Sequence, residues 1–301
     1  MKAKIMNTKI KSFIPSASHS FRGAVCAGVV LLTASSVQAQ NLFVSDVGGN
    51  IFQFTPGGTQ STFASGLGNY PEGLAFNSAG DLFASDFSSG NIYEFTPGGV
   101  RSTFASGLAG PSGVAFDGAG NLFVANYGNG TVTKITPGGT ETTFASGFGL
   151  ATGLAFDNAG NLFVVSTGVG GINKITPGGV ASTFSAGFYG AGLAFNSAGN
   201  LFAGFDQSPS GYIAEFTPGG VESTFATGLN YPVALAFNSA GNLFVGNQTS
   251  GIITEITPGA VESTFATVGE VQGLAFQPVP EPSVLGLLAI GATALVVRRR
   301  R

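Results

Sequence analysis

Residues 81–120 read DLFASDFSSGNIYEFTPGGVRSTFASGLAGPSGVAFDGAG, and this stretch is one copy of a repeat that organises the chain. The same frame begins at six positions: Asn41, Asp81, Asn121, Asn161, Asn200 and Asn242. Successive copies are therefore 39 to 42 residues apart. A fixed period of about 40 residues is typical of stacked or circular repeat folds, so the repeat decides the fold class.

Each copy contains four short apolar segments separated by turn residues. In the second copy we expect strands at residues 73–76, 82–85, 92–95 and 102–105. The first turn, residues 77–80, ends in a glycine that supplies the left-handed conformation of a tight hairpin. The second turn, Thr96-Pro97-Gly98-Gly99, predicts a type II turn with positive φ at its first glycine. Because the last copy has Ala260 in place of the second glycine, only the first glycine is expected to be sterically required.

The strands carry apolar side chains on both faces, as in Leu42-Phe43-Val44. Antiparallel sheets with one wet face alternate apolar and polar residues, so these sheets should be covered on both sides. Four-stranded sheets packed face to face around a ring meet that requirement, which predicts an all-β fold, a six-bladed β-propeller. The chain enters at a second strand, from Asn41, and finishes with a first strand, residues 273–276. The two ends should therefore complete one blade and close the ring; an open β-solenoid is the competing architecture.

Both ends of the chain have the pattern of sorting signals. A basic segment, an apolar run over 24–34 and small residues up to Ala39 predict a secretory signal peptide, residues 1–39, cut after Ala39. A short transmembrane anchor is the alternative. Residues 279–301 comprise Val279-Pro280-Glu281-Pro282-Ser283, an apolar span over 284–297 and four arginines. The span would reach about 21 Å, short of the bilayer core of about 30 Å, and the arginines would hold its end in the cytoplasm.

The remaining domain, residues 40–278, lacks the side chains of the commonest catalytic devices. Cys26 and His19 lie in the leader, so Ser–His and Cys–His arrangements are excluded from the domain. Its three basic residues stand against fourteen acidic ones, a formal charge of −11. Such a surface repels nucleic acid, because phosphate binding rests on Lys and Arg. We expect Lys134 to pair across strands with Glu141 on a solvated outer surface.

The tail resembles the PEP-CTERM sorting tail of Gram-negative bacteria: a Pro-Glu-Pro motif, an apolar span and a basic end. The resemblance implies export across the inner membrane, transient anchoring, recognition by an exosortase and cleavage near the motif; a plain C-terminal anchor is the alternative. The repeat also resembles NHL-repeat and gluconolactonase (senescence-marker-like) propellers over residues 41–276, on Pro71-Glu72-Gly73-Leu74-Ala75-Phe76 through Asp81-Leu82-Phe83-Ala84-Ser85-Asp86. That likeness specifies fold and not function, since the scaffold hosts enzymes and binders alike. Virginiamycin-lyase-like propellers depend on a histidine, which this domain lacks.

Recognition is expected on the face that carries the loops before the first strand and after the second, because only these loops differ between copies. At the channel mouth on this face, Asp46, Asp86 and Asn126 end second strands, and Glu72 precedes a first strand. The positions that match Glu72 hold Ser112, Thr152, Ala191, Val233 and Gln272. Glu72, Asp46, Asp86 and Asn126 offer hard oxygen ligands for a calcium-like ion, and the gluconolactonase resemblance implies a carboxylate and amide metal site there. The alternative, which we favour, is that they cap loop amides.

Two functions fit these observations. The favoured one is a non-catalytic binding or scaffold protein at the cell surface or in the extracellular matrix, with no cofactor. Its partners would be signal peptidase and an exosortase during export, and then a surface protein or an exopolysaccharide, the partner that the PEP-CTERM resemblance implies. Contact with a membrane would be made only through the tail, before cleavage. The alternative is a Ca²⁺-dependent, lactonase-like hydrolase that uses Glu72 with Asp46 or Asp86.

Overall fold

The computed structural model describes residues 39–68, 70–187, 189–205 and 210–279. The chain divides into two units, Met1–Ser36 and Val37–Arg301, and every described residue belongs to the second. The signal peptide up to residue 38 and the tail from Pro280 onward lie outside the described residues, and so do the predictions made for them. Within the described ranges, no helix is long and apolar enough to cross a membrane.

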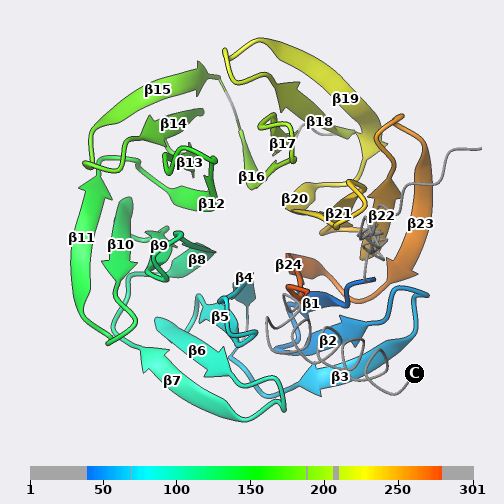
Figure 1. Ribbon diagram of the computed structural model, residues 1–301, viewed down its shortest axis with the longest axis horizontal. Helices are drawn as coiled ribbons and strands as arrows, with labels where there is room; N and C mark the ends of the chain where they lie inside the picture. The colour runs from blue at the N-terminus through cyan, green and yellow to red at the C-terminus, as the bar shows by residue number, and fades with distance from the viewer. Residues whose placement is uncertain (1–38, 69, 188, 206–209, 280–301) are drawn as a thin grey trace, which may run out of the picture. The chain divides into compact units, whose positions relative to one another are not determined.

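The described part of the second unit forms 24 strands in six four-stranded antiparallel sheets, which are the blades of a ring (Figure 1). The blade that holds both chain ends is blade 1. It contains β24 (Val271–Phe276), β1 (Leu42–Asp46), β2 (Ile51–Phe54) and β3 (Gln60–Ala64). Blade 2 contains β4 (Pro71–Phe76), β5 (Leu82–Asp86), β6 (Asn91–Phe95) and β7 (Arg101–Ala105). Blade 3 contains β8 (Pro111–Phe116), β9 (Leu122–Asn126), β10 (Thr131–Ile135) and β11 (Glu141–Ser146).

The other three blades repeat this order. Blade 4 contains β12 (Ala151–Phe156), β13 (Leu162–Ser166), β14 (Gly171–Ile175) and β15 (Ala181–Ala186). Blade 5 contains β16 (Gly190–Phe195), β17 (Leu201–Phe205), β18 (Gly211–Phe216) and β19 (Glu222–Leu229). Blade 6 contains β20 (Pro232–Phe237), β21 (Leu243–Asn247), β22 (Ile252–Ile256) and β23 (Glu262–Thr267). The prediction of an all-β propeller of six four-stranded blades is confirmed.

The ring is closed by pairing the two ends of the domain, as predicted. In blade 1 the last strand, β24, pairs antiparallel with the first, β1, with Leu42 opposite Phe276 and Val44 opposite Leu274. The innermost strands also contact one another around the ring, and β24 lies between β4 and β20. Strand β1 is therefore paired on both edges, with β24 and with β2, which leaves no open edge at the junction.

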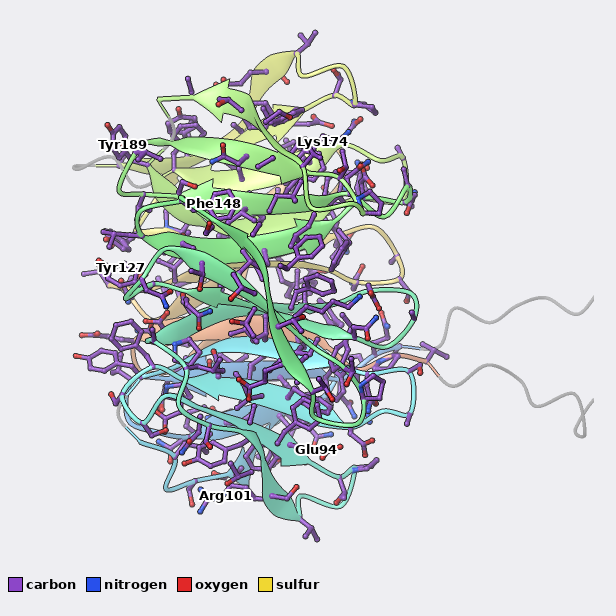
Figure 2. The ribbon with its side chains drawn as sticks, turned by 90° about the vertical axis from the view of Figure 1, so that its left-hand side faces the viewer. Glu94, Arg101, Tyr127, Phe148, Lys174 and Tyr189 are labelled. Carbon is purple, nitrogen blue, oxygen red and sulfur yellow. The ribbon has the colours of Figure 1, made fainter. Side chains whose placement is uncertain are left out.

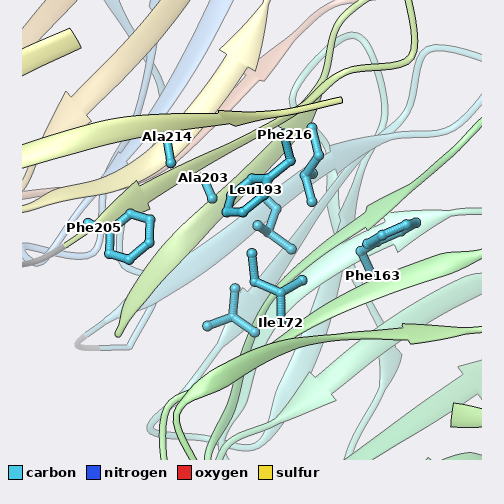
Figure 3. Close-up of a cluster of buried hydrophobic side chains, with 9 residues drawn as sticks. Phe163, Ile172, Leu193, Ala203, Phe205, Ala214 and Phe216 are labelled. Atoms are coloured by element: carbon cyan, nitrogen blue, oxygen red, sulfur yellow. The ribbon is translucent and has the colours of Figure 1, made fainter. Parts of the chain in front are cut away.

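Phenylalanines on the second strands join each blade to the next. Phe43 on β1 meets Phe63 of its own blade and Phe76 of blade 2 edge to face, at centroid distances of 4.9 and 5.0 Å. The same arrangement surrounds the equivalent phenylalanines of the other blades, Phe83, Phe123, Phe163, Phe202 and Phe244. Figure 3 shows the layer between blades 4 and 5, where Phe163 and Ile172 face Leu193 and Phe205. Such pairs contribute about 0.5–1.5 kcal/mol each beyond the area they bury.

The second hairpin turn differs from the sequence prediction. Its second glycine, not its first, adopts positive φ, as at Gly139 (φ 80°), and Ala260 adopts the same conformation (φ 57°). The turn bond runs from Gly139 N to Thr136 O (2.8 Å), and Thr136 N donates to Thr140 O (3.0 Å). This is a turn followed by a left-handed residue that forms a bulge, the usual geometry of a three-residue hairpin loop. The prediction that only the first glycine is sterically required is therefore wrong.

The predicted ion pair on the outer surface is also wrong. The register of β10 and β11 places Lys134 opposite Thr142 and Glu141 opposite Ile135, and adjacent residues of a strand point to opposite faces. The Lys134 ammonium instead lies over the ring of Phe123, 5.6 Å from its centroid. Lys174, at the same position of blade 4, forms an ion pair with Asp157 at 3.7 Å.

Candidate functional site

The propeller has two unlike faces. The turn face carries the hairpin turns between the first and second strands and between the third and fourth, and the recognition face carries the loops at the opposite ends of these strands. In the edge-on view of Figure 2, Tyr127 and Tyr189 lie on the recognition face, at the left of the picture. The turns are nearly alike in all copies, whereas the recognition-face loops differ in sequence.

A cavity of about 250 Å³ lies at the centre of the recognition face, and we call it the cup. Its floor is a ring of one large apolar residue from each inner strand: Leu74, Val114, Leu154, Leu193, Leu235 and Leu274. All six have a residual exposure of 7–8%, so they share one environment at the bottom of the cup. Two residues earlier, each inner strand contributes one wall residue: Gln272, Glu72, Ser112, Thr152, Ala191 and Val233. The floor thus forms an apolar ring deeper in the channel than the wall residues.

Glycines between the wall and floor positions let the inner strands approach one another closely. A Cβ on Gly153 would overlap the backbone carbonyl oxygen of Ala191 in the next blade, and one on Gly113 would overlap that of Thr152. Glycine is thus required at this position where the backbone of the next blade approaches so closely, whereas blade 6 has Ala234 there.

The wall of the cup is polar on one side and apolar on the other. Following the ring of inner strands, Gln272, Glu72, Ser112 and Thr152 come from four consecutive blades, and Ala191 and Val233 come from the remaining two. A ligand in the cup would therefore meet hydrogen-bonding groups along one arc and hydrocarbon along the other.

Two polar atoms of the wall lack a hydrogen-bond partner among the described residues. They are Thr152 Oγ1 and Gln272 Nε2, both buried. The other side of the Gln272 amide is used, because its Oε1 accepts a hydrogen bond from Gln248 Nε2 at 3.1 Å. Buried polar atoms without partners are rare and costly, at about 1–3 kcal/mol each, and they call for a water molecule or a ligand.

Glu72 is the single carboxylate in the wall of the cup. Burial raises the pKa of Glu72 above its ordinary value of 4.5, and a hydrogen bond from the Ser112 hydroxyl offsets part of that rise. The neutral form of this side chain is therefore favoured more than in water. A neutral carboxyl both donates and accepts hydrogen bonds, which suits an uncharged, hydroxyl-rich ligand.

The other three predicted metal ligands do not line the cup. Asp86 is fully buried and accepts hydrogen bonds from the backbone amides of Gly68 (3.0 Å), Ser88 (3.1 Å) and Ser89 (3.2 Å). It thereby fastens the loop after β5 to the segment that enters the blade, and we call such a residue a latch. Asp46 accepts a hydrogen bond from the backbone amide of Asn50 at 2.9 Å.

Asn126 is held inside its own blade. Its amide donates to Thr131 Oγ1 (3.1 Å) and Thr133 Oγ1 (2.9 Å), and its Oδ1 is buried without a partner among the described residues. No group of three or more His, Cys, Asp or Glu side chains placed to hold a metal ion occurs in the described ranges. Of the four candidate ligands, the structure thus brings only Glu72 into the cup, and the binding of calcium stays a prediction.

Sequence reasoning missed the tyrosines of the recognition face. Four of the six tyrosines lie in its loops: Tyr70, Tyr127, Tyr189 and Tyr231. Tyr127 and Tyr231 line the cup, and Tyr127 packs edge to face on Phe87 at 5.6 Å. Tyr70 and Tyr189 are about half exposed, at 47% and 56%. The signal was available, because tyrosines concentrated in variable loops are typical of binding surfaces.

The fold and the cup define the chain as a closed six-bladed β-propeller with a central cavity. Its C-terminus matches the PEP-CTERM protein-sorting motif over residues 278–301. This motif indicates export, processing by an exosortase and a surface or secreted location. No curated protein sequence matches the chain.

Solved structures show the same fold at low sequence identity. A chain in the crystal structure of a nidogen/laminin complex is 18% identical with a TM-score of 0.70, covering 81% of this chain and all of that one. Virginiamycin B lyase from Staphylococcus aureus, in a catalytically inactive histidine-to-alanine form with quinupristin, is 14% identical with a TM-score of 0.60, covering 80% and 94%. A putative gluconolactonase is 16% identical with a TM-score of 0.58, covering 67% and 79%. At these identities the structures show a shared propeller fold.

Proposed function

We propose that this protein is an exported, non-catalytic binding protein that holds a neutral sugar residue of a matrix polysaccharide in the cup. The observation that carries the proposal is the division of the cup wall into a polar arc and an apolar arc above an apolar floor. A pyranose ring has hydroxyl groups around its edge and C–H groups on its faces, so it matches both arcs. A cavity of about 250 Å³ lies just below the usual range for drug-sized ligands, about 300–1,000 Å³, and suits one sugar residue.

The unpartnered atoms of the wall support this assignment. Gln272 and Thr152 belong to blades 1 and 4, which lie opposite each other in the ring. Both atoms are buried in the structure, so a ligand spanning the cup would reach them once the two side chains turn toward it. Gln272 Nε2 donates a hydrogen bond, and Thr152 Oγ1 donates or accepts one. Hydroxyl groups at the two ends of a sugar ring would satisfy both atoms.

The charge of the domain supports a neutral ligand. Residues 40–278 have a formal charge of −11, and the cup contains a carboxyl and no basic residue among its lining. Polyanionic ligands would be repelled. A central cavity of about 250 Å³ would take a chain end or a branch rather than the middle of a long polymer.

The absence of histidine and cysteine from the domain supports binding rather than turnover. The lyase neighbour is described as catalytically inactive when one histidine is replaced by alanine. The nidogen/laminin neighbour shows that the fold also occurs in a complex between proteins. Export would follow the route that the two ends of the sequence predict. The signal peptide would be cut after Ala39, the tail would anchor the protein transiently in the inner membrane, and an exosortase would cleave near the Pro-Glu-Pro motif.

Replacing Thr152 by valine tests the proposal, because valine keeps the shape of threonine and removes Oγ1. On an array of neutral and acidic oligosaccharides, the wild-type protein should bind neutral chains, and Thr152→Val should weaken that binding about tenfold, the loss of one hydrogen bond of about 1.4 kcal/mol. The variant should melt no lower than the wild type, since the removed hydroxyl has no partner in the structure. Thr103→Val, on the exposed outer strand β7, is the matched control. Absence of binding to every glycan, or equal binding by Thr152→Val, would refute the proposal.

A calcium-dependent lactonase is the second candidate, favoured by the likeness to a putative gluconolactonase. It requires an ion held by Glu72 together with Asp46, Asp86 and Asn126. Melting in EDTA and in millimolar calcium separates the two candidates, because an ion bound only by the folded protein raises its melting temperature.

A further inference from the structure

The two ends of the domain leave the propeller side by side. Gln277 N donates to Asn41 O at 2.9 Å, and the Gln40 side chain donates to Gln277 O at 3.0 Å. The Gln40 Oε1 accepts a hydrogen bond from Ser239 N at 2.8 Å, which ties the same point to blade 6. We call Gln40, Asn41 and Gln277 the seam. It fixes the position of the first domain residue after Ala39 and of the last strand before the sorting motif.

The seam lies on the turn face. The bond from Gln277 N to Asn41 O repeats the bond from Asn77 N to Asp81 O (3.0 Å) that closes the first turn of blade 2. The seam is therefore an open version of that turn, between the innermost strand β24 and its neighbour β1. Both chain ends thus leave near the axis of the ring, on the face opposite the cup.

The tether between the seam and the apolar span is short. Residues 278–283 separate Gln277 from Val284, and six residues reach at most about 20 Å when fully extended. Strand β24 alone has six residues and separates the two faces by about 20 Å. To bring the recognition face to the lipid, the tether would have to run from the turn face around the outside of the ring to the opposite face. Six residues are too short for that path.

We propose that the precursor, while its tail is held in the membrane, has its turn face against the lipid surface and its cup pointing away from it. This inference rests on the tail-borne export route of the proposed function. The cup is then open to matrix ligands before the tail is cut, so cleavage changes the location of the protein and not its ability to bind.

The turn face also presents apolar groups suited to a lipid headgroup layer. In four blades a valine follows the second hairpin turn, and all four are 65–68% exposed: Val100, Val180, Val221 and Val261. Side chains of this kind gain free energy when they enter the interfacial region of a membrane. They bias the tethered domain toward the flat orientation.

Single cysteines at the two ends of strand β5 test the orientation, because the domain has no cysteine of its own. Ala79→Cys lies on the turn face and Ser89→Cys on the recognition face, both exposed, in a full-length Cys26→Ser chain. A fluorophore on each cysteine is measured in lipid vesicles whose headgroups carry a nitroxide quencher. The label at residue 79 should be quenched several-fold more strongly than that at residue 89, and protease release of the domain should abolish the difference.

Equal quenching of both labels, or stronger quenching at residue 89, would overturn the orientation while leaving glycan binding by the cup intact. A chain absent from the vesicle fraction would overturn the anchor and this inference with it. Failure of the proposed function is seen separately, in the glycan array. A precursor that binds the same neutral oligosaccharides in vesicles as it does after release supports an outward-facing cup.

Discussion

Replacing Asp86 by alanine should destabilise the propeller strongly, whether or not calcium is present. The carboxylate is fully buried and accepts three backbone N–H bonds, from Gly68, Ser88 and Ser89. Hydrogen bonds to a charged group contribute about 1.5–3 kcal/mol each, and partial access of water to the freed amides reduces the sum to about 3–5 kcal/mol. For a domain of this size, 1 kcal/mol corresponds to about 2–4 °C, so the melting temperature should fall by about 6–20 °C.

The assay is thermal melting of wild type and variants, each in EDTA and in millimolar calcium. Asp81→Ala, at the other end of the same strand, is the control: its carboxylate is half-buried and accepts one side-chain bond, from Asn77 at 2.9 Å, so its loss should stay below about 1 kcal/mol. The melting temperature of Asp86→Asn should lie between those of Asp86→Ala and Asp81→Ala. A loss below about 1 kcal/mol for Asp86→Ala would refute the latch. A calcium-dependent rise in the wild type that Asp86→Ala abolishes would favour an ion site instead.

Three further predictions concern the turns and the cup. Gly139→Ala should cost about 1–2 kcal/mol because its φ is positive, whereas Gly138→Ala should be neutral or stabilising by up to about 1 kcal/mol; the reverse order in urea unfolding would restore the type II turn. Ala260→Gly should stabilise by about 0.5–1 kcal/mol, since it relieves the same strain at φ 57°, and a lower urea midpoint would contradict this. Glu72→Gln should gain stability relative to the wild type as pH rises above 4.5, because the raised pKa of Glu72 makes the wild type lose stability over that range. A stability difference between these two proteins that does not change from pH 4 to pH 8 would contradict the burial of Glu72.

The fold was predictable because the sequence features that determine it recur in every repeat. A repeat of about 40 residues, apolar strands and the split blade at the chain ends determined blade count, strand order and closure without reference to any side-chain contact. The conformation of the Thr-Pro-Gly-Gly turn was not predictable in the same way, because both glycines satisfy the sequence pattern. Ala260 suggested that the second position does not need glycine. An alanine adopts left-handed φ at a cost of about 1–2 kcal/mol, and the stability of the rest of the ring compensates for this cost.

The candidate site was predictable in part. Glu72 and the five matching wall positions were correctly expected to meet at the channel mouth. The sequence did not show that the other three candidates, Asp46, Asp86 and Asn126, lie outside the cup. Which residues face the cup depends on a shift in strand register. In blade 2 the pairing of β4 with β5 shifts between Pro71 and Leu74, which leaves the Glu72 and Gly73 positions unpaired at a bulge beside the channel. Bulges redirect side chains next to functional sites and have no reliable sequence signature.

The latch position explains how a six-fold scaffold can hold a one-sided cup. The base of the recognition-face loop is fixed by a different interaction in each of three blades: Asp86 binds backbone amides, Ser166 accepts a bond from Asn173 at 2.8 Å, and Phe205 stacks on Tyr212 at 4.3 Å. Because the latch fixes the loop whatever its chemistry, the wall residue of the same blade is free to change from glutamate to threonine to alanine. The blade itself is held by the phenylalanine layers and turn glycines, and among the wall residues Val233 also packs against such a layer. Six different wall residues are therefore compatible with one blade architecture, which is how loops and exposed positions on a rigid scaffold can vary without altering the fold.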